Sequence, residues 1–98
     1  MEVGIMSFEK AQASLSGSNT WCGPLLLSPG GFDFFVWGDF VGTVTLQASP
    51  NDGQDWVPVQ TYSDASVDLG QVSREGLYRA GFASGDYTSG TANIQFRQ

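Results

Sequence analysis

Short runs of alternating apolar and polar residues, separated by turns rich in glycine and proline, recur about every ten residues along this chain. This rhythm is typical of antiparallel β-strands, whose side chains point alternately to the two faces of a sheet. The composition agrees, because charged residues make up only 14% and glycines number 13, whereas helix surfaces normally carry many lysines and glutamates. We therefore expect an all-β domain of about seven or eight short antiparallel strands, either a β-sandwich or a jelly-roll-like barrel.

The clearest unit is a hairpin in residues 41–62. In its first arm Val44, Leu46 and Ala48 alternate with polar residues, which predicts that one face of the strand points inward. The second arm contains Pro58, which has no backbone N–H to donate to a neighbouring strand. This proline predicts an edge position or a β-bulge.

The turn between the two arms, SPNDG in residues 49–53, combines proline, Asx side chains and glycine, which tight turns favour. With the residues that follow, it resembles the Asp-box of sialidases and related β-proteins, written S-x-D-x-G-x-T-W. Asn51 stands in place of the aspartate of that box, and Asp55 stands in place of the threonine. The resemblance implies a device that stabilises a hairpin, not a catalytic site, and its expected members are Ser49, Asn51, Asp52, Gly53 and Trp56.

The remaining strands are expected at residues 9–16, 21–27, 32–37, 65–69, 77–82 and 91–97, with a polar turn at 83–90. Residues 1–8 are expected to form an arm that is either disordered alone or ordered by docking on a neighbour. The β-domain would then occupy residues 9–98. No apolar run is long enough for a membrane span and the N-terminus lacks a signal pattern, so we expect no membrane partner.

One expected strand, FDFFVW, is apolar on both faces. Phe32, Phe34 and Val36 would point to one side of the sheet. Phe35 and Trp37 would point to the other. Such a strand is either central and covered on both sides by the protein itself, or exposes one face to a partner. Both interpretations remain open, although so small a domain has little material for a second cover.

Several classes of function are disfavoured by what the chain lacks. A net charge of −6 repels phosphate, so we expect no nucleic-acid partner. Histidine, the commonest general base and transition-metal ligand, is absent. Without a histidine to activate it, Cys22 is expected to be a buried and inert thiol.

Four turn carboxylates could be imagined around a calcium ion, but their spacing fits no EF-hand. They are Asp52, Asp55, Asp64 and Asp68. We therefore expect solvated carboxylates, with no metal, no cofactor and no catalytic set, and the chain is predicted not to be an enzyme.

A second resemblance covers residues 42–98. The segments GTVTLQASPNDGQDW (42–56), LYR (77–79) and GDYTSGT (85–91) are similar, in this order, to segments of small all-β proteins of tailed-phage virions. The resemblance implies a virion structural protein assembled in the host cytoplasm, usually a head decoration or cement protein. It also implies binding to the major capsid protein or other virion proteins, and self-association as dimers or trimers. A position in the tail or fibre is the alternative that it leaves open.

A cement protein requires adhesive surfaces, and aromatic side chains dominate the energetics of interfaces. Arg79 is a cation in mid-strand, which must pair with an acid, stack on an aromatic ring or face solvent. The expected interface residues are Phe8, Phe35, Trp37, Phe40 and Arg79. The competing hypothesis is a carbohydrate-binding module on a tail fibre, which would use Trp37 or Trp56 with turn carboxylates.

Overall fold

The computed structural model describes residues 10–98, which form eight β-strands and no helix. No helix in this range could therefore cross a membrane. The expected arm in residues 1–8, with Phe8, lies outside the described residues. The strands are β1 (Lys10–Leu15), β2 (Thr20–Leu27), β3 (Gly30–Trp37), β4 (Phe40–Ala48), β5 (Val57–Tyr62), β6 (Ser66–Val72), β7 (Gly76–Gly90) and β8 (Ala92–Arg97).

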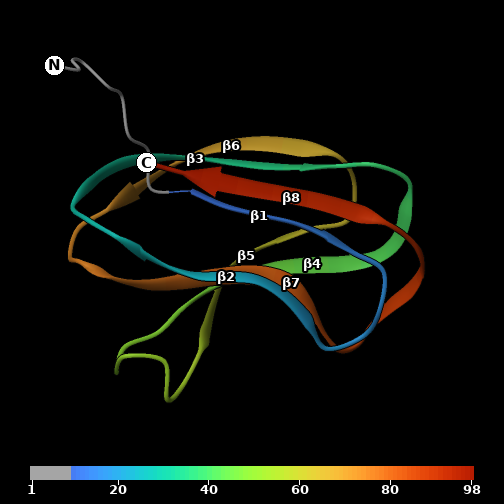
Figure 1. Cartoon of the computed structure of the whole chain (residues 1–98), viewed down its shortest axis with the longest axis horizontal. Coiled ribbons are helices and arrows are strands. Elements are labelled where there is room, and N and C mark those ends of the chain that lie inside the picture. Colours follow the sequence, from blue (N-terminus) through green and yellow to red (C-terminus); the bar gives the residue numbers. More distant parts are fainter. Residues whose placement is uncertain (1–9) are drawn as a thin grey trace, which may run out of the picture.

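The strands form two four-stranded antiparallel sheets, which confirms the expected all-β class. The upper sheet has the order β1-β8-β3-β6, and the lower sheet has the order β2-β7-β4-β5. Pairing is nested along the chain, because β1 pairs with β8, β2 with β7, β3 with β6 and β4 with β5. Figure 1 shows the two sheets as two layers, one above the other.

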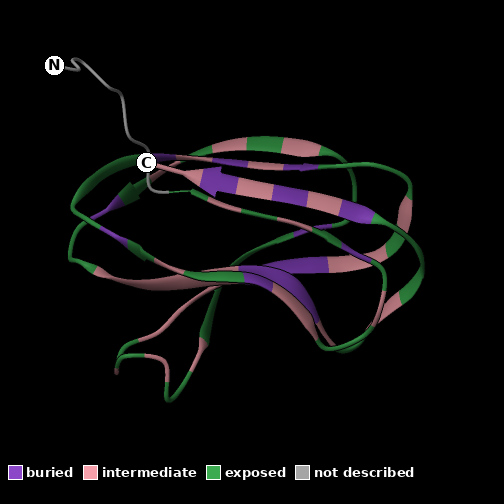
Figure 2. Cartoon of the chain, viewed as in Figure 1, coloured by how far each residue is buried: buried purple, intermediate pink, exposed green. Residues whose placement is uncertain are grey.

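The hydrophobic core lies between the two layers. Its largest fully buried side chains include Phe34 of β3, Phe82 of β7 and Phe96 of β8, so both sheets contribute to it. The ring of Phe34 stacks on that of Tyr62 from the lower sheet, with 4.8 Å between centroids. Figure 2 shows the resulting alternation along β8, where every second residue is buried, as its sequence predicts.

Pro58 has the position that its chemistry predicts. β5 is an edge strand of the lower sheet, so only one of its sides is paired. Its register against β4 shifts between Leu46 and Gln47, next to the pair that Pro58 forms with Gln47. An edge strand with an irregular ladder tolerates a residue that has no N–H. The prediction of an edge or a bulge is confirmed.

The predicted turn at residues 83–90 is wrong, because β7 continues through this segment to Gly90. Its second half pairs with the start of β4, where Phe40 lies opposite Gly90. Gly85 and Gly90 both have φ of 86°, a conformation that glycine adopts without strain, and the register against β4 shifts twice. The glycines therefore bend a continuous strand where the sequence indicated a reversal. The other strands begin and end close to their expected positions.

Phe34 and Phe35 are neighbours in β3 that point to opposite faces, and they provide a matched test of the core. Phe34→Ala should lower the free energy of unfolding by about 3–5 kcal/mol, because this side chain is only 1% exposed and its removal would leave a cavity in the core. Phe35→Ala should lower it by only about 0.5–1 kcal/mol, because this ring is partly exposed. Urea denaturation measures both, and equal losses would contradict the assignment of the two faces.

Candidate functional site

An apolar patch lies on the outer face of the upper sheet. Phe35 and Trp37 come from β3, and Val67 and Leu69 come from the neighbouring edge strand β6. The register places Phe35 opposite Val67. Trp37, Val67 and Leu69 are 42%, 66% and 74% exposed. We call these four residues the β3–β6 patch.

The patch exists because β6 reverses the usual placement of apolar and polar side chains. Val67 and Leu69 face outward, whereas Asp68 faces the interior and its carboxylate accepts a hydrogen bond of 2.8 Å from the hydroxyl of Tyr62. Sequence reasoning missed Val67 and Leu69 as surface residues. The alternation within residues 66–72 defines two faces, but it does not say which one points inward.

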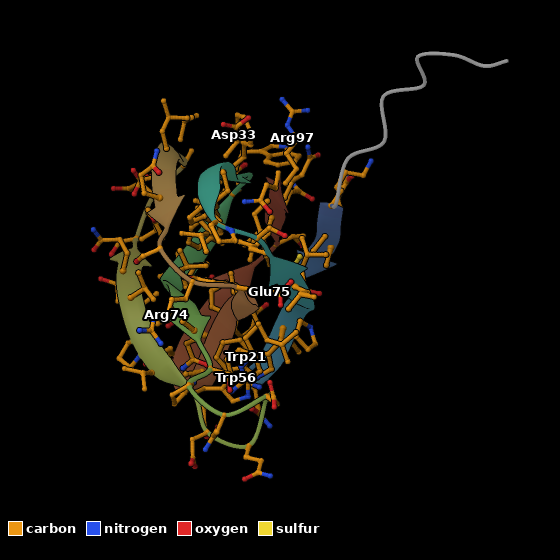
Figure 3. All side chains as sticks on the ribbon, turned by 90° about the vertical axis from the view of Figure 1, so that its left-hand side faces the viewer. Trp21, Asp33, Trp56, Arg74, Glu75 and Arg97 are labelled. Atoms are coloured by element: carbon orange, nitrogen blue, oxygen red, sulfur yellow. The ribbon has the colours of Figure 1, made fainter. Side chains whose placement is uncertain are left out.

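Paired charges border the patch. Nε of Arg97 lies 3.4 Å from Oδ2 of Asp33, and both side chains are about 40% exposed. The Arg97 guanidinium also lies 5.7 Å from the centroid of the Phe35 ring. Figure 3 shows Asp33 and Arg97 close together at the top of the molecule, on the side of the upper sheet. An apolar centre with a charged rim is the usual anatomy of a protein interface.

Phe40 does not belong to this patch, which corrects the expectation that it joins Phe35 and Trp37. The chain crosses from the upper to the lower sheet at residues 38–39, and Phe40 begins β4. Its ring meets Phe82 edge to face, with centroids 5.8 Å apart, and packs against the core. The crossing restarts the alternation, so the spacing from Trp37 does not indicate the face of Phe40.

Arg79 lies between two tryptophans of the lower sheet and its loop. Its guanidinium carbon is 3.9 Å from the centroid of the Trp21 ring and 4.4 Å from that of Trp56. Its Nε donates a hydrogen bond of 2.8 Å to the side-chain oxygen of Gln47. Figure 3 shows both tryptophans together, on the side of the molecule opposite Asp33 and Arg97. Of the alternatives for Arg79, the stacked one is therefore observed.

This environment affects the charge of Arg79 only slightly. Burial lowers the pKa of Arg79 from its usual value, but a guanidinium stays protonated near neutral pH. Within residues 10–98 no carboxylate pairs with it. Cation–π contacts therefore take the place of an ion pair. Through its contact with Trp56, the Arg79 side chain holds the turn against the outer face of the lower sheet.

The turn itself is held by its own side chains. The hydroxyl of Ser49 accepts hydrogen bonds from the backbone N–H groups of Gly53 at 2.7 Å and of Asn51 at 3.3 Å. The side-chain oxygen of Asn51 accepts one from the N–H of Asp55 at 2.8 Å. Asp52 and Gly53 reverse the backbone with φ of 59° and 94°. These contacts are those of a structural turn, as the Asp-box resemblance implies.

The other polar groups considered as candidates form local contacts. Asp55 accepts a hydrogen bond from the side-chain amide of Asn51, and Asp68 accepts one from Tyr62. In the described part of the chain, no three His, Cys, Asp or Glu residues could hold a metal ion together. Cys22 is 1% exposed, and burial raises the pKa of its thiol to about 11.

The stack predicts unequal effects of the same substitution at two arginines. Arg79→Lys should lower the free energy of unfolding by about 1–2 kcal/mol, because an ammonium cannot fill the planar space between two indoles. Arg97→Lys should lower it by about 0–1 kcal/mol, because its ion pair with Asp33 lies at the surface, where water screens the charges. Thermal melts of both variants provide the comparison. A smaller loss of stability for Arg79→Lys than for Arg97→Lys would contradict a stabilising contribution of the stack.

Burial of Cys22 predicts slow thiol chemistry in the folded protein. At pH 8 the raised pKa keeps the thiol protonated, and the sulfur is also inaccessible, so iodoacetamide should alkylate it only after unfolding. Mass spectrometry with and without urea measures the modification. Rapid alkylation of the native protein would show that β2 is not packed as described.

Residues 10–98 thus provide an apolar surface that no other part of this range covers, a stacked cation and a turn held by its own side chains. Comparison of the chain with models of known protein families, with curated proteins and with solved structures found no match.

Proposed function

We propose that this chain is a non-enzymatic structural protein of a tailed-phage virion. It would decorate the head, bind across joints between capsid subunits and stabilise the assembled shell. The observation that carries this proposal is the β3–β6 patch, because a solvated sheet face does not require clustered aromatic and aliphatic groups. The resemblance of residues 42–98 to small virion proteins supports other virion proteins, such as the major capsid protein, as the partner.

We also propose that the two sheets form a jelly roll. The nested pairing of β1 with β8 through β4 with β5 is the order expected when one long hairpin folds over on itself. Double-sheet jelly rolls of eight strands occur in viral capsid proteins and in lectins. Such a scaffold holds a broad outer face rigidly, which suits a protein that acts by contact.

The proposed mechanism is stabilisation by mass action. A protein that binds the assembled lattice, but not the separated subunits, shifts the equilibrium toward assembly. Phe35 and Trp37 would supply the aromatic anchors, and the Asp33–Arg97 pair would form part of the polar rim. Self-association as dimers or trimers at the lattice axes would let each unit bridge several capsid subunits.

The patch differs from the other exposed apolar side chains. Among residues 10–98 the other large ones are Leu26, Val41, Val57 and Val59, which all belong to the lower sheet and include no aromatic ring. Aromatic residues are enriched among the side chains that contribute most to binding. The upper face is therefore the better candidate for docking.

A carbohydrate-binding module of the tail or fibre is the second candidate. The exposed ring of Trp37 favours it, because sugars stack on accessible aromatic faces. Trp56 is the weaker of the two platforms considered, because Arg79 covers one face of its ring. Because both proposed functions would use Trp37, binding to shells and binding to glycans must be measured in parallel.

The test mixes the purified protein with phage shells that lack it. The wild-type protein should cosediment with the shells and raise their rupture temperature. Combined Trp37→Ser and Leu69→Ser substitutions should weaken binding by about tenfold or more, because they remove two side chains of the patch. Leu26→Ser is the matched control, since Leu26 is 47% exposed on the other sheet and should bind normally.

Two results would contradict the proposal. Shells that rupture at the same temperature with and without the protein would reject a cement function. Saturable binding to a host polysaccharide that Trp37→Ser abolishes, without binding to shells, would favour the carbohydrate-binding alternative.

A further inference from the structure

A cavity of about 180 Å³ opens between the two sheets, on the side where the edge strands β5 and β6 lie. On the other side of the molecule β1 packs near β2 and closes the gap between the layers. Neither β5 nor β6 has a second strand neighbour in its own sheet, so the mouth of the cavity is bordered by both. Exposed Val59 and Leu69 line this mouth.

Four aromatic rings line the interior of the cavity, and they form two pairs that join the sheets. Phe32 contacts Tyr78 with ring centroids 5.8 Å apart, and Phe34 stacks on Tyr62 at 4.8 Å. Gly70 of β6 allows the Phe32 ring to pack closely against the strand, because a Cβ at this position would lie 2.3 Å from the ring. An apolar cavity of about 150 Å³ accommodates a molecule as large as benzene, so this one admits a compact group of that size.

One charged group, Asp68, lies among these rings. Its carboxylate accepts a hydrogen bond of 2.8 Å from the hydroxyl of Tyr62. Burial, helped by this hydrogen bond and by the carboxylate charge, raises the pKa of Tyr62, so its hydroxyl remains a donor. A carboxylate offers about four acceptor positions, and within residues 10–98 no other group donates to Asp68.

The charge of the cavity is therefore unbalanced. Among residues 10–98 no lysine or arginine lines it, so Asp68 is the only charged side chain that this part of the chain contributes to the lining. The whole chain also carries a net charge of −6, which raises the local concentration of cations. Aromatic rings attract a cation through their electron-rich faces, and methylated ammonium groups are typical ligands of aromatic cages. A strongly hydrated metal ion or a free lysine ammonium would lose more hydration in such a place.

We propose that this cavity binds a methylated ammonium group. The rings of Phe32, Tyr62 and Tyr78 would contact the methyl groups, with Phe34 packed behind Tyr62, and Asp68 would balance the positive charge. This site goes beyond the proposed virion function and does not depend on it, because its aromatic lining lies behind β6, whereas the β3–β6 patch lies on the outer face and shares only Leu69 with the cavity. The ligand could be a free small cation or the headgroup of a lipid, which share this chemistry.

The test titrates the full-length protein with choline and follows backbone amide signals by NMR. Choline should shift the signals of β5 and β6 saturably, with little change in β1. The control ligand is 3,3-dimethylbutan-1-ol, which has the same shape but carries no charge. It should bind at least tenfold more weakly. Vesicles of phosphatidylcholine form the second arm, and binding to them in addition to choline would identify a lipid headgroup as the source.

Two variants separate ligand binding from a structural effect. Asp68→Asn removes the charge and should weaken choline binding by about tenfold or more, with no effect on the neutral control. Tyr62→Phe removes the other partner of the same hydrogen bond but keeps the carboxylate, so it should bind choline at least half as well as the wild type. Thermal melts establish that both variants are folded.

Three outcomes would overturn the proposal. The first is an absence of saturable shifts with choline. The second is equal affinity for choline and its neutral analogue. The third is an equal loss of binding in folded Asp68→Asn and Tyr62→Phe, which would mean that the charge of Asp68 does not account for the binding. None of these outcomes bears on binding to shells, so the proposed virion function would be unaffected.

Discussion

The contact of β3 with the lower sheet is the constraint on which the other features depend. Phe32 and Phe34 pack against Tyr78 and Tyr62 and so join the two layers. Successive side chains of a strand point to opposite faces, so burial of these rings forces Phe35 and its neighbours on that face outward. The exposed surface of the upper sheet is thus a geometric consequence of the core, combined with the choice of aromatic residues at the outward positions.

The aromatic residues on the two outer faces of the molecule differ in whether they contact a cation of the chain or remain exposed. On the lower sheet Trp21 and Trp56 enclose Arg79, so most of their attraction for a cation is satisfied within the chain. On the upper sheet Trp37 remains 42% exposed, and the Arg97 guanidinium lies only near the ring of Phe35. The exposed apolar side chains of the lower sheet are therefore aliphatic, whereas the upper face also retains exposed aromatic area that association would remove from water.

Local chemistry made a large part of this fold predictable. The turn at residues 49–53 and the edge position of Pro58 each depend on backbone preferences that neighbours scarcely change. The inward direction of Ile94 and Phe96 follows from strict alternation in β8. A strand is thus predictable where one of its faces is clearly apolar, and a turn is predictable where its residues favour turns over strands.

The remaining features depend on tertiary contacts that alternation cannot report. Glycines at Gly85 and Gly90 indicate a turn, yet pairing with β4 makes β7 continuous. In β6 the carboxylate of Asp68 could have faced water, but Tyr62 offers it a hydrogen bond from the other sheet. The exposure of Val67 follows from the inward direction of Asp68, and the packing of Phe40 against the core follows from the crossing of the chain at residues 38–39. The sequence therefore predicts Phe35 and Trp37 at a surface, whereas the cavity and the exposure of Val67 and Leu69 depend on how the two sheets pack together.

The position of β8 has a further consequence for how the protein is made. This strand is the last in the chain, yet it lies inside the upper sheet, between β1 and β3. On the ribosome, β1 and β3 emerge early and have no bridge between them until β8 leaves the exit tunnel. The upper sheet can therefore be completed only after β8 has been translated, whereas the pairing of β4 with β5 can form from neighbouring segments as they emerge.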